Sequence, residues 1–167
     1  LAFSTIGMMA QTPAGNAFRI DYAEYQATGA IKLLNAGNNA ILNPGDQLTV
    51  MCWIQLRDIG DNQKIIGKFN LDNTGFILGV DQGRVYSEVW NPTHYETLDG
   101  LMNPTAQHWH HIAMTYERGV AIKAFMNGIE VSSDPVSNAP ISSSTNPLII
   151  GVSSWTTMSN FQTFGNI

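Results

Sequence analysis

The chain has 167 residues, about the length of one domain. Its hydrophobic fraction of 44% is enough for one sizeable core and excludes wholesale disorder, whereas its charged fraction of 13% is about half the usual share. A net charge of -5, with only eight Lys and Arg residues, argues against binding of DNA or RNA through a basic face. No apolar run approaches the roughly 18 residues of a membrane span, so membrane insertion is not expected.

The single cysteine, Cys52, excludes an intramolecular disulfide and a zinc site built on several thiolates. It lies between Met51 and Trp53 in the middle of a strand-like segment, and a free cysteine behaves as a small apolar residue. We therefore expect a buried, unreactive thiol. The lack of disulfides fits a bacterial, archaeal or phage protein that is exposed to the outside, or an intracellular protein.

Residues 1–29 are interpreted as an N-terminal extension or arm, and residues 30–167 as one domain. Within the arm, Phe18–Tyr25 reads FRIDYAEY, which alternates apolar and polar residues and predicts one half-buried strand. We expect this strand to fill an open sheet edge, either in its own chain or in a neighbouring one. Ile31–Leu34 is compatible with a helical turn, which the following NAGNN would end.

Strand signals dominate the rest of the chain. The segments rich in β-branched and apolar residues are Leu48–Leu56, Lys64–Phe69, Gly75–Val80, Arg84–Trp90, Trp109–Tyr116, Val120–Met126, Ile129–Ser132 and Leu148–Val152. Turn residues separate them, and Asn127-Gly128 is the strongest hairpin signal. Residues 133–147, with three prolines, predict a long surface loop. The pattern predicts an all-β fold, a two-sheet antiparallel β-sandwich or jelly roll with little or no helix. We expect Trp53, Ile112 and Phe125 to be largely buried.

The segment WHHIAMTY, Trp109–Tyr116, resembles the W-x-H-V-A-x-T-Y strand of laminin-G-like, concanavalin A-like jelly-roll domains. Four further segments are similar to pieces of that family in the same order: NPGDQLTVMCWI, IIGKF, AFMNGIEV and LIIG. The resemblance covers about Ala30–Ile167 and implies the jelly-roll fold. Phe164–Ile167 looks like the start of the family's closing strand, so the last strand is expected to be incomplete.

The histidines permit a metal interpretation. His108, His110 and His111 lie close together, and His94 precedes them. On a strand, His108 and His110 would share a face with Cα atoms roughly 6.6 to 6.8 Å apart, which suits two ligands of a metal ion. A structural interpretation is favoured, because His111 occupies the family's structural histidine position and His108 falls in the loop before the strand.

Calcium is the common ion of the family that the chain resembles, held by carboxylates and carbonyls on loops. The candidate ligands here are Asp72, Asn73 and Asp81, with Asp58 and Asp61 as further loop residues. The alternative is that these residues make local backbone hydrogen bonds in turns. Calcium is therefore a possible cofactor, and no other is expected.

Glycosidases also use this sandwich, and they need two carboxylates about 5 Å or about 6.5 to 9.5 Å apart. None of the five glutamates has an acidic residue two positions away. Only Glu88 lies inside a predicted sheet strand with the right potential exposure. We therefore expect no enzymatic activity.

Aromatic residues predict a ligand-binding site more strongly than the histidines or carboxylates predict a metal or catalytic site. Sugars have flat apolar faces on which rings stack, while amide and imidazole groups bond to the hydroxyls. The predicted ligand-binding residues are Trp90, Asn91, His94, Tyr95 and Trp155, which end one strand or follow strands in loops. The alternative is that Trp90, like Trp53 and Trp109, belongs to the core.

The predicted function is a non-catalytic extracellular binding or adhesion module for glycans or a cell-surface partner. The alternative is a structural protein of an assembly, such as a virion surface or decoration protein, or a subunit of a surface layer or filament. The low charge and the arm favour this alternative, because an exposed sheet edge invites pairing with another chain. Either function predicts a location outside the cell or on a cell or virion surface.

Overall fold

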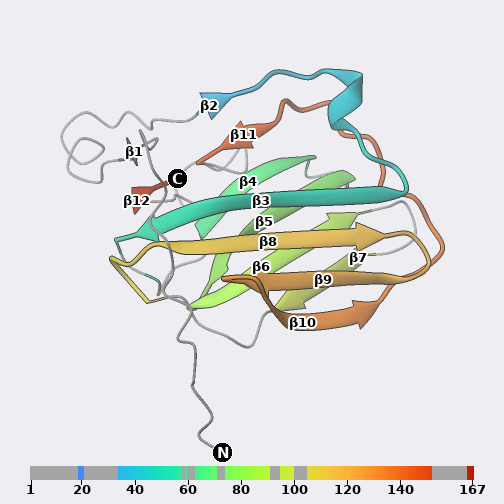
Figure 1. The fold of residues 1–167 in the computed structure, drawn as a ribbon. Coiled ribbons are helices and arrows are strands. Elements are labelled where there is room, and N and C mark those ends of the chain that lie inside the picture. Colours follow the sequence, from blue (N-terminus) through green and yellow to red (C-terminus); the bar gives the residue numbers. More distant parts are fainter. Residues whose placement is uncertain are drawn as a thin grey trace, which may run out of the picture.

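The computed structural model describes residues 19–20, 34–57, 59, 63–70, 74–90, 95–99, 105–151 and 165–167. Within them the chain forms two six-stranded sheets, in which every strand pairs with its neighbours antiparallel (Figure 1). Sheet A has the order β1-β12-β3-β8-β9-β10, and sheet B has the order β2-β11-β4-β5-β6-β7. The predicted all-β sandwich is confirmed, and the helical structure described is one three-residue 3-10 turn, η1.

The strands of sheet A are β1 (Arg19–Ile20), β12 (Gly165–Asn166), β3 (Gln47–Leu56), β8 (His110–Glu117), β9 (Ala121–Met126) and β10 (Ile129–Pro135). Those of sheet B are β2 (Leu34–Asn35), β11 (Ile149–Ile150), β4 (Gln63–Asn70), β5 (Thr74–Asp81), β6 (Arg84–Trp90) and β7 (Tyr95–Asp99). Each predicted strand segment thus corresponds to a strand, although β11 is shorter than expected. The Asn127-Gly128 hairpin turn is confirmed, with φ of 52° and 80°.

Two local expectations are wrong. Leu34, placed in a helical turn, instead belongs to β2, because its backbone pairs with Ile150 of β11; residues 31–33 lie outside the described residues. Tyr95, placed in a loop, begins β7, which the polar sequence YETLD did not predict. Pairing of Tyr95 with Trp90 on β6 adds this strand to the sheet edge.

The core lies between the sheets. Alternate residues of β3, from Leu48 to Leu56, face it together with Ile112, Met114 and Tyr116 of β8. Ile112 is fully buried, as expected. The expectations for Trp53 and Phe125 are wrong.

Trp53 and Phe125 are half-buried rather than largely buried, and both point away from the core. Phe125 lies opposite Ala113, and the core residues of β9 alternate with it. Both faces of these strands carry apolar residues, so alternation alone does not tell which face is inside.

Sheet B is buried on its second face as well. Phe69, Ile77, Tyr86 and Trp90 form a separate buried group there, which we name the buried aromatic cluster. The strands β5 and β6 are therefore covered on both faces, which explains the near-continuous apolar run of β5, whereas β6 also buries Ser87 and Glu88.

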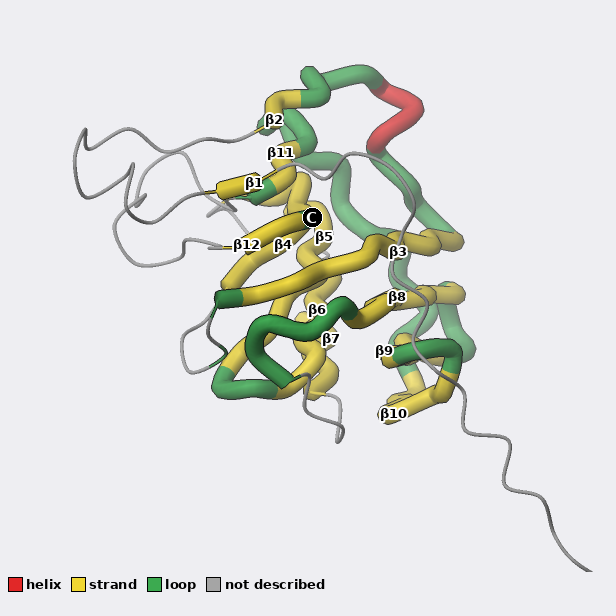
Figure 2. Tube along the Cα trace, turned by 60° about the vertical axis from the view of Figure 1, so that its left-hand side comes forward, coloured by secondary structure: helices red, strands yellow, loops and turns green. Residues whose placement is uncertain are grey.

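The arm closes one edge of sheet A within its own chain. Arg19 and Ile20 pair with Asn166 and Gly165 of β12, which in turn pairs with β3. Figure 2 shows β1 next to β12 at this edge. The rest of the predicted strand Phe18–Tyr25 lies outside the described residues.

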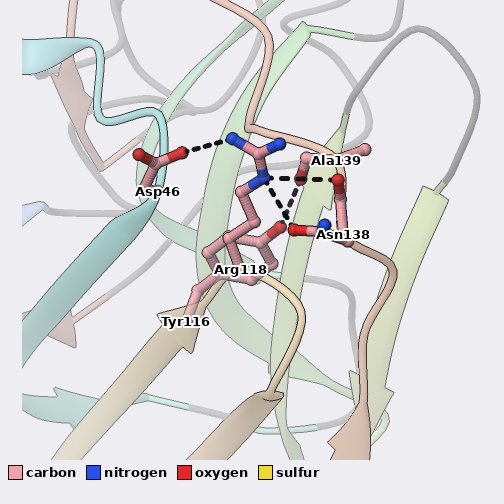
Figure 3. A network of polar contacts seen from close by, with 5 residues as sticks. All are labelled: Asp46, Tyr116, Arg118, Asn138 and Ala139. Carbon is pink, nitrogen blue, oxygen red and sulfur yellow. Dashed lines mark hydrogen bonds and ion pairs between the residues drawn. The ribbon is translucent and has the colours of Figure 1, made fainter.

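Residues 136–148 carry the chain from β10 in sheet A to β11 in sheet B, and we name them the crossing segment. Figure 1 shows it in orange, running past the strand ends. The start of the segment is fixed by polar contacts (Figure 3). Arg118 pairs with Asp46 at 3.1 Å and donates to the Asn138 carbonyl at 3.2 Å, and the Tyr116 hydroxyl donates to the Ala139 carbonyl at 2.8 Å. Residues 133–135 of the predicted surface loop instead belong to β10, where they pair with β9, and these polar contacts hold the loop that follows.

We predict that Ile112→Ala lowers the free energy of unfolding by about 2 to 5 kcal/mol, because it opens a cavity in the core. Phe125→Ala should cost less than about 2 kcal/mol, since its ring is already partly exposed. Urea unfolding of both variants measures the difference. An equal or larger cost for Phe125→Ala would contradict this placement.

We predict that native Cys52 reacts slowly with a thiol reagent. Cys52 is half-buried rather than buried, with its side chain packed against the core. Burial raises the pKa of this thiol from 9.0 to about 12, and the reactive thiolate is therefore scarce near neutral pH. Its contribution to stability is present below pH 9 and declines as the pH rises from 9.0 toward about 12. The control is the protein unfolded in guanidinium, which should react fast; comparable rates in both states would refute the prediction.

We predict that deletion of residues 1–29 lowers Tm by a few °C without changing the number of chains per particle, because β12 loses its partner β1 within the same chain. Calorimetry and analytical ultracentrifugation measure the two quantities. An unchanged Tm would make the arm a passive extension. A smaller particle would mean that the arm pairs with a neighbouring chain.

Candidate functional site

The residues predicted to bind a ligand lie partly inside the described structure. Trp90 ends β6 and is 8% exposed, with its ring stacked on Phe69 at a centroid distance of 5.4 Å and an interplanar angle of 15°. The backbone of Tyr95 lies directly opposite Trp90 on β7. Asn91, His94 and Trp155 lie outside the described residues. Trp90 is therefore buried, as the alternative interpretation expected, but it lies on the second face of sheet B and not in the main core.

Charged side chains border the buried aromatic cluster. The Lys64 ammonium lies 4.9 Å from the centroid of the Phe69 ring, a cation–π distance. Burial lowers the pKa of Lys64, while the carboxylates of Glu88 and Asp81 oppose that shift. Glu88 is itself 3% exposed. A carboxylate, an ammonium and aromatic rings thus share the face of sheet B that points away from the core.

Glu88 and Asp81 do not form the carboxylate pair of a glycosidase. Glu88 lies opposite Ile77 on β5, and Asp81 follows Ile77 by four residues on the same strand. This places the two Cα atoms about 14 Å apart, from about 3.3 Å per residue along a strand and about 4.8 Å between strands. Their side chains stand roughly perpendicular to the sheet, so the carboxylates stay well beyond the range of about 5 to 9.5 Å.

The histidine group is held by contacts within the protein. His110 Nε2 accepts a hydrogen bond from the Thr105 amide at 3.0 Å, and its Nδ1 lies 3.3 Å from the Asn127 amide nitrogen. Burial and the neighbouring His108 lower the pKa of His110, and the Thr105 carbonyl opposes them. The His111 ring contacts Trp53 edge-on at 5.5 Å. His108 lies before β8 rather than on it, so it does not share a strand face with His110.

Of the predicted calcium ligands, Asp81 is described, at the end of β5 opposite Arg84. Asp72 and Asn73 lie outside the described residues. Across the described ranges, no group of three His, Cys, Asp or Glu side chains is placed to hold a metal ion. In those same ranges, no helix has the length and apolarity needed to span a membrane.

The outer face of sheet A carries apolar and aromatic side chains that sequence reasoning missed. Met51, Ala113 and Phe125 lie side by side on β3, β8 and β9, and Trp53 and His111 form the next pair along the same face. Met51 is 59% exposed, and Trp53, His111 and Phe125 are partly exposed. We name these five residues the aromatic face.

Polar groups surround the aromatic face. Thr49 and Thr115 form the next cross-strand pair on one side, followed on β9 by Lys123. Lys123 pairs with Glu130 of β10 at 2.9 Å. Three ring systems in the centre and uncharged or paired polar groups at the rim therefore share one accessible surface.

One signal in the sequence pointed to this surface: β8 is apolar on both faces, which is typical of a strand that has one face on the core and the other on a groove. The signal did not identify the partners from β3 and β9. Those depend on the register Met51–Ala113–Phe125, which only strand pairing defines.

The comparisons with known proteins agree on the fold. The K499G mutant of NanB sialidase from Streptococcus pneumoniae aligns with a TM-score of 0.67 and 16% identity, over 92% of this chain and 24% of that one. The CBM40 of Ruminococcus gnavus IT-sialidase, bound to alpha2,3 sialyllactose, aligns with a TM-score of 0.64 and 16% identity, over 80% and 82% of the two chains. Domains LG4-5 of the mouse laminin alpha1 chain align with a TM-score of 0.59 and 15% identity, over 80% and 36%. At these identities the likeness concerns the fold.

No curated protein matches the sequence significantly. The laminin G family model, described as concanavalin A-like lectin/glucanases superfamily, matches residues 26–164. This range covers most of the chain and includes both sheets apart from β1 and β12. The chain therefore belongs to the laminin G group of the concanavalin A-like lectin/glucanase superfamily.

Proposed function

We propose that this chain is a non-catalytic extracellular module that binds glycans on a cell surface. The observation that carries the proposal is the aromatic face. Trp53, Phe125 and Met51 keep exposed apolar surface on a sheet whose core side already holds ample apolar residues. An apolar patch rimmed by polar residues is typical of an interaction site.

The chemistry of the aromatic face suits a glycan better than an apolar protein surface. Indole and phenyl rings stack on the flat C–H face of a sugar ring, and the hydroxyls of Thr49 and Thr115 lie in the adjacent cross-strand pair to bond to sugar hydroxyls. The nearby cation, Lys123, is already paired with Glu130. With a net charge of -5, the chain should prefer uncharged glycans over sialylated ones.

The loop end of sheet B is a second candidate surface of the same function. Trp90 and Tyr95 pair at the end of β6, and Asn91 and His94 lie between them in the sequence. Trp155 belongs to the same predicted site. Trp90 would support this site by packing on Phe69 rather than by touching the ligand with a free ring.

The printed names of structural neighbours support a binding role. The Ruminococcus gnavus CBM40 is bound to alpha2,3 sialyllactose, and another neighbour is the receptor binding domain of botulinum neurotoxin D, with a TM-score of 0.56. The separation of Glu88 and Asp81 supports a non-catalytic module. The alternative role as an assembly subunit has less support, since β1 occupies the sheet edge within the same chain.

We predict that the protein binds neutral glycans on an array, and that Trp53→Ala combined with Phe125→Ala abolishes binding. Loss of two stacking rings removes the main apolar contact with the sugar. The matched control is Ile41→Ala, which removes an 85% exposed apolar side chain remote in sequence from the aromatic face. Circular dichroism and Tm confirm that all variants remain folded.

The same array distinguishes the two surfaces. Loss of binding in Trp155→Ala, with the double variant unaffected, would move the site to the loop end of sheet B. Absence of glycan binding by the unaltered protein, together with a large stable particle, would support the assembly role. Release of reducing sugar that Glu88→Gln abolishes would overturn the non-catalytic assignment.

A further inference from the structure

Lys68 carries a charged side chain that is 0% exposed. It lies on β4 opposite Phe76, whose side chain is in the core, so Lys68 also points to the inner side of sheet B. A buried ammonium is costly unless each of its donors is satisfied. Its Nζ donates to the Asn38 side-chain oxygen at 2.6 Å, to the Ser144 carbonyl at 2.9 Å and to the Asn146 carbonyl at 2.5 Å. The three N–H donors thus have three neutral oxygen acceptors.

These acceptors come from two parts of the chain that are far apart in sequence. Asn38 follows β2, whereas Ser144 and Asn146 belong to the crossing segment. Further bonds connect the same parts: Asn38 donates to the Thr145 carbonyl at 2.7 Å, and the Ser144 amide donates to the Asn43 side chain at 3.1 Å. Lys68 therefore lies at the centre of a cage that joins β4 to both segments.

Hydrogen bonds of Ser142 connect the crossing segment to the end of β6. The Ser142 amide donates to the Trp90 carbonyl at 2.9 Å, and the Ser142 carbonyl accepts from the Gly75 amide at 2.9 Å. Gly75 has φ +94°, and a Cβ there would lie 1.8 Å from the Lys68 carbonyl oxygen, so this close approach requires glycine. Trp90 is the last residue of β6, and Asn91 and His94 follow it in the sequence.

We propose that the Lys68 ammonium acts as an internal cation, in the place that a bound metal ion would otherwise fill, and that it positions the crossing segment and the loop end of β6. A cage of amide and carbonyl oxygens is the kind of ligand set that binds a hard cation. Here the protein supplies the cation on its own side chain. The influence on ligand binding rests on the proposed function, whereas the positioning of the crossing segment does not.

The experiment is chemical rescue of Lys68→Ala. This substitution removes three methylenes and the ammonium, which propylammonium replaces in size and charge. We expect the variant to lose about 5 °C or more in Tm and to be cleaved by protease within residues 142–148. Propylammonium should restore both properties, whereas propanol and tetramethylammonium should not. Lys68→Met is the matched control, because its side chain fills the space without a charge and leaves no room for propylammonium.

An unchanged Tm in Lys68→Ala, or equal stabilisation of Lys68→Met by propylammonium, would overturn the proposal. If Lys68→Ala does not fold, the unaltered protein provides the test: nitrogen NMR should show one lysine ammonium whose protons exchange slowly with water. Absence of such a signal would also overturn it. Glycan affinity measured with and without propylammonium tests the effect on the loop end. Rescue of Tm in a protein that binds no glycan would refute the proposed function alone.

Discussion

The structure depends on satisfying the backbone of the crossing segment. After β10 the chain must pass from sheet A to sheet B, and residues 136–148 have no ladder of their own to pair with. A segment without regular structure that lies against a core needs a partner for each buried N–H and C=O group. The partners come from every neighbouring element: Gly45 bonds the Ile141 amide at 2.8 Å, and Gly37 bonds the Leu148 amide at 3.0 Å. Side chains of Tyr116, Arg118 and Lys68 donate further hydrogen bonds to carbonyl groups of the segment.

This constraint explains two unusual features of a chain with few charges. The buried ammonium of Lys68 supplies three donors to the Asn38 side-chain oxygen and to the Ser144 and Asn146 carbonyls. Arg118 performs a similar task at the exposed start of the segment, where its ion pair with Asp46 adds little by itself because both groups are accessible to water. In both cases the cation holds loop backbone in place by donating hydrogen bonds to carbonyl groups. For Arg118 these bonds contribute more than its ion pair with Asp46.

The two sheets use their second faces differently. Sheet B buries the aromatic cluster of Phe69, Ile77, Tyr86 and Trp90 on the face that points away from the core. Sheet A leaves Met51, Trp53 and Phe125 accessible on its outer side. The proposed binding surface therefore lies on the sheet whose outer face keeps accessible rings. This difference between the sheets also explains why tryptophans of similar sequence context, Trp53 and Trp90, have different environments.

The sequence by itself determined most of the strand segments, though not β2 or β7, together with the Asn127-Gly128 hairpin, the sandwich class and the burial of Ile112, because these follow from local alternation and turn chemistry. The sequence also predicted the short strand of the arm, because Phe18–Tyr25 alternates apolar and polar residues. The tertiary structure decided which face of β3 and β9 is inside, and so left Trp53 and Phe125 partly exposed on the outer face. It also decided that Lys68 is buried and that Ser142 bonds to Trp90. These outcomes depend on register between strands and on contacts between residues far apart in sequence. In strands that are apolar on both faces, the pattern of one segment shows neither the register nor those contacts.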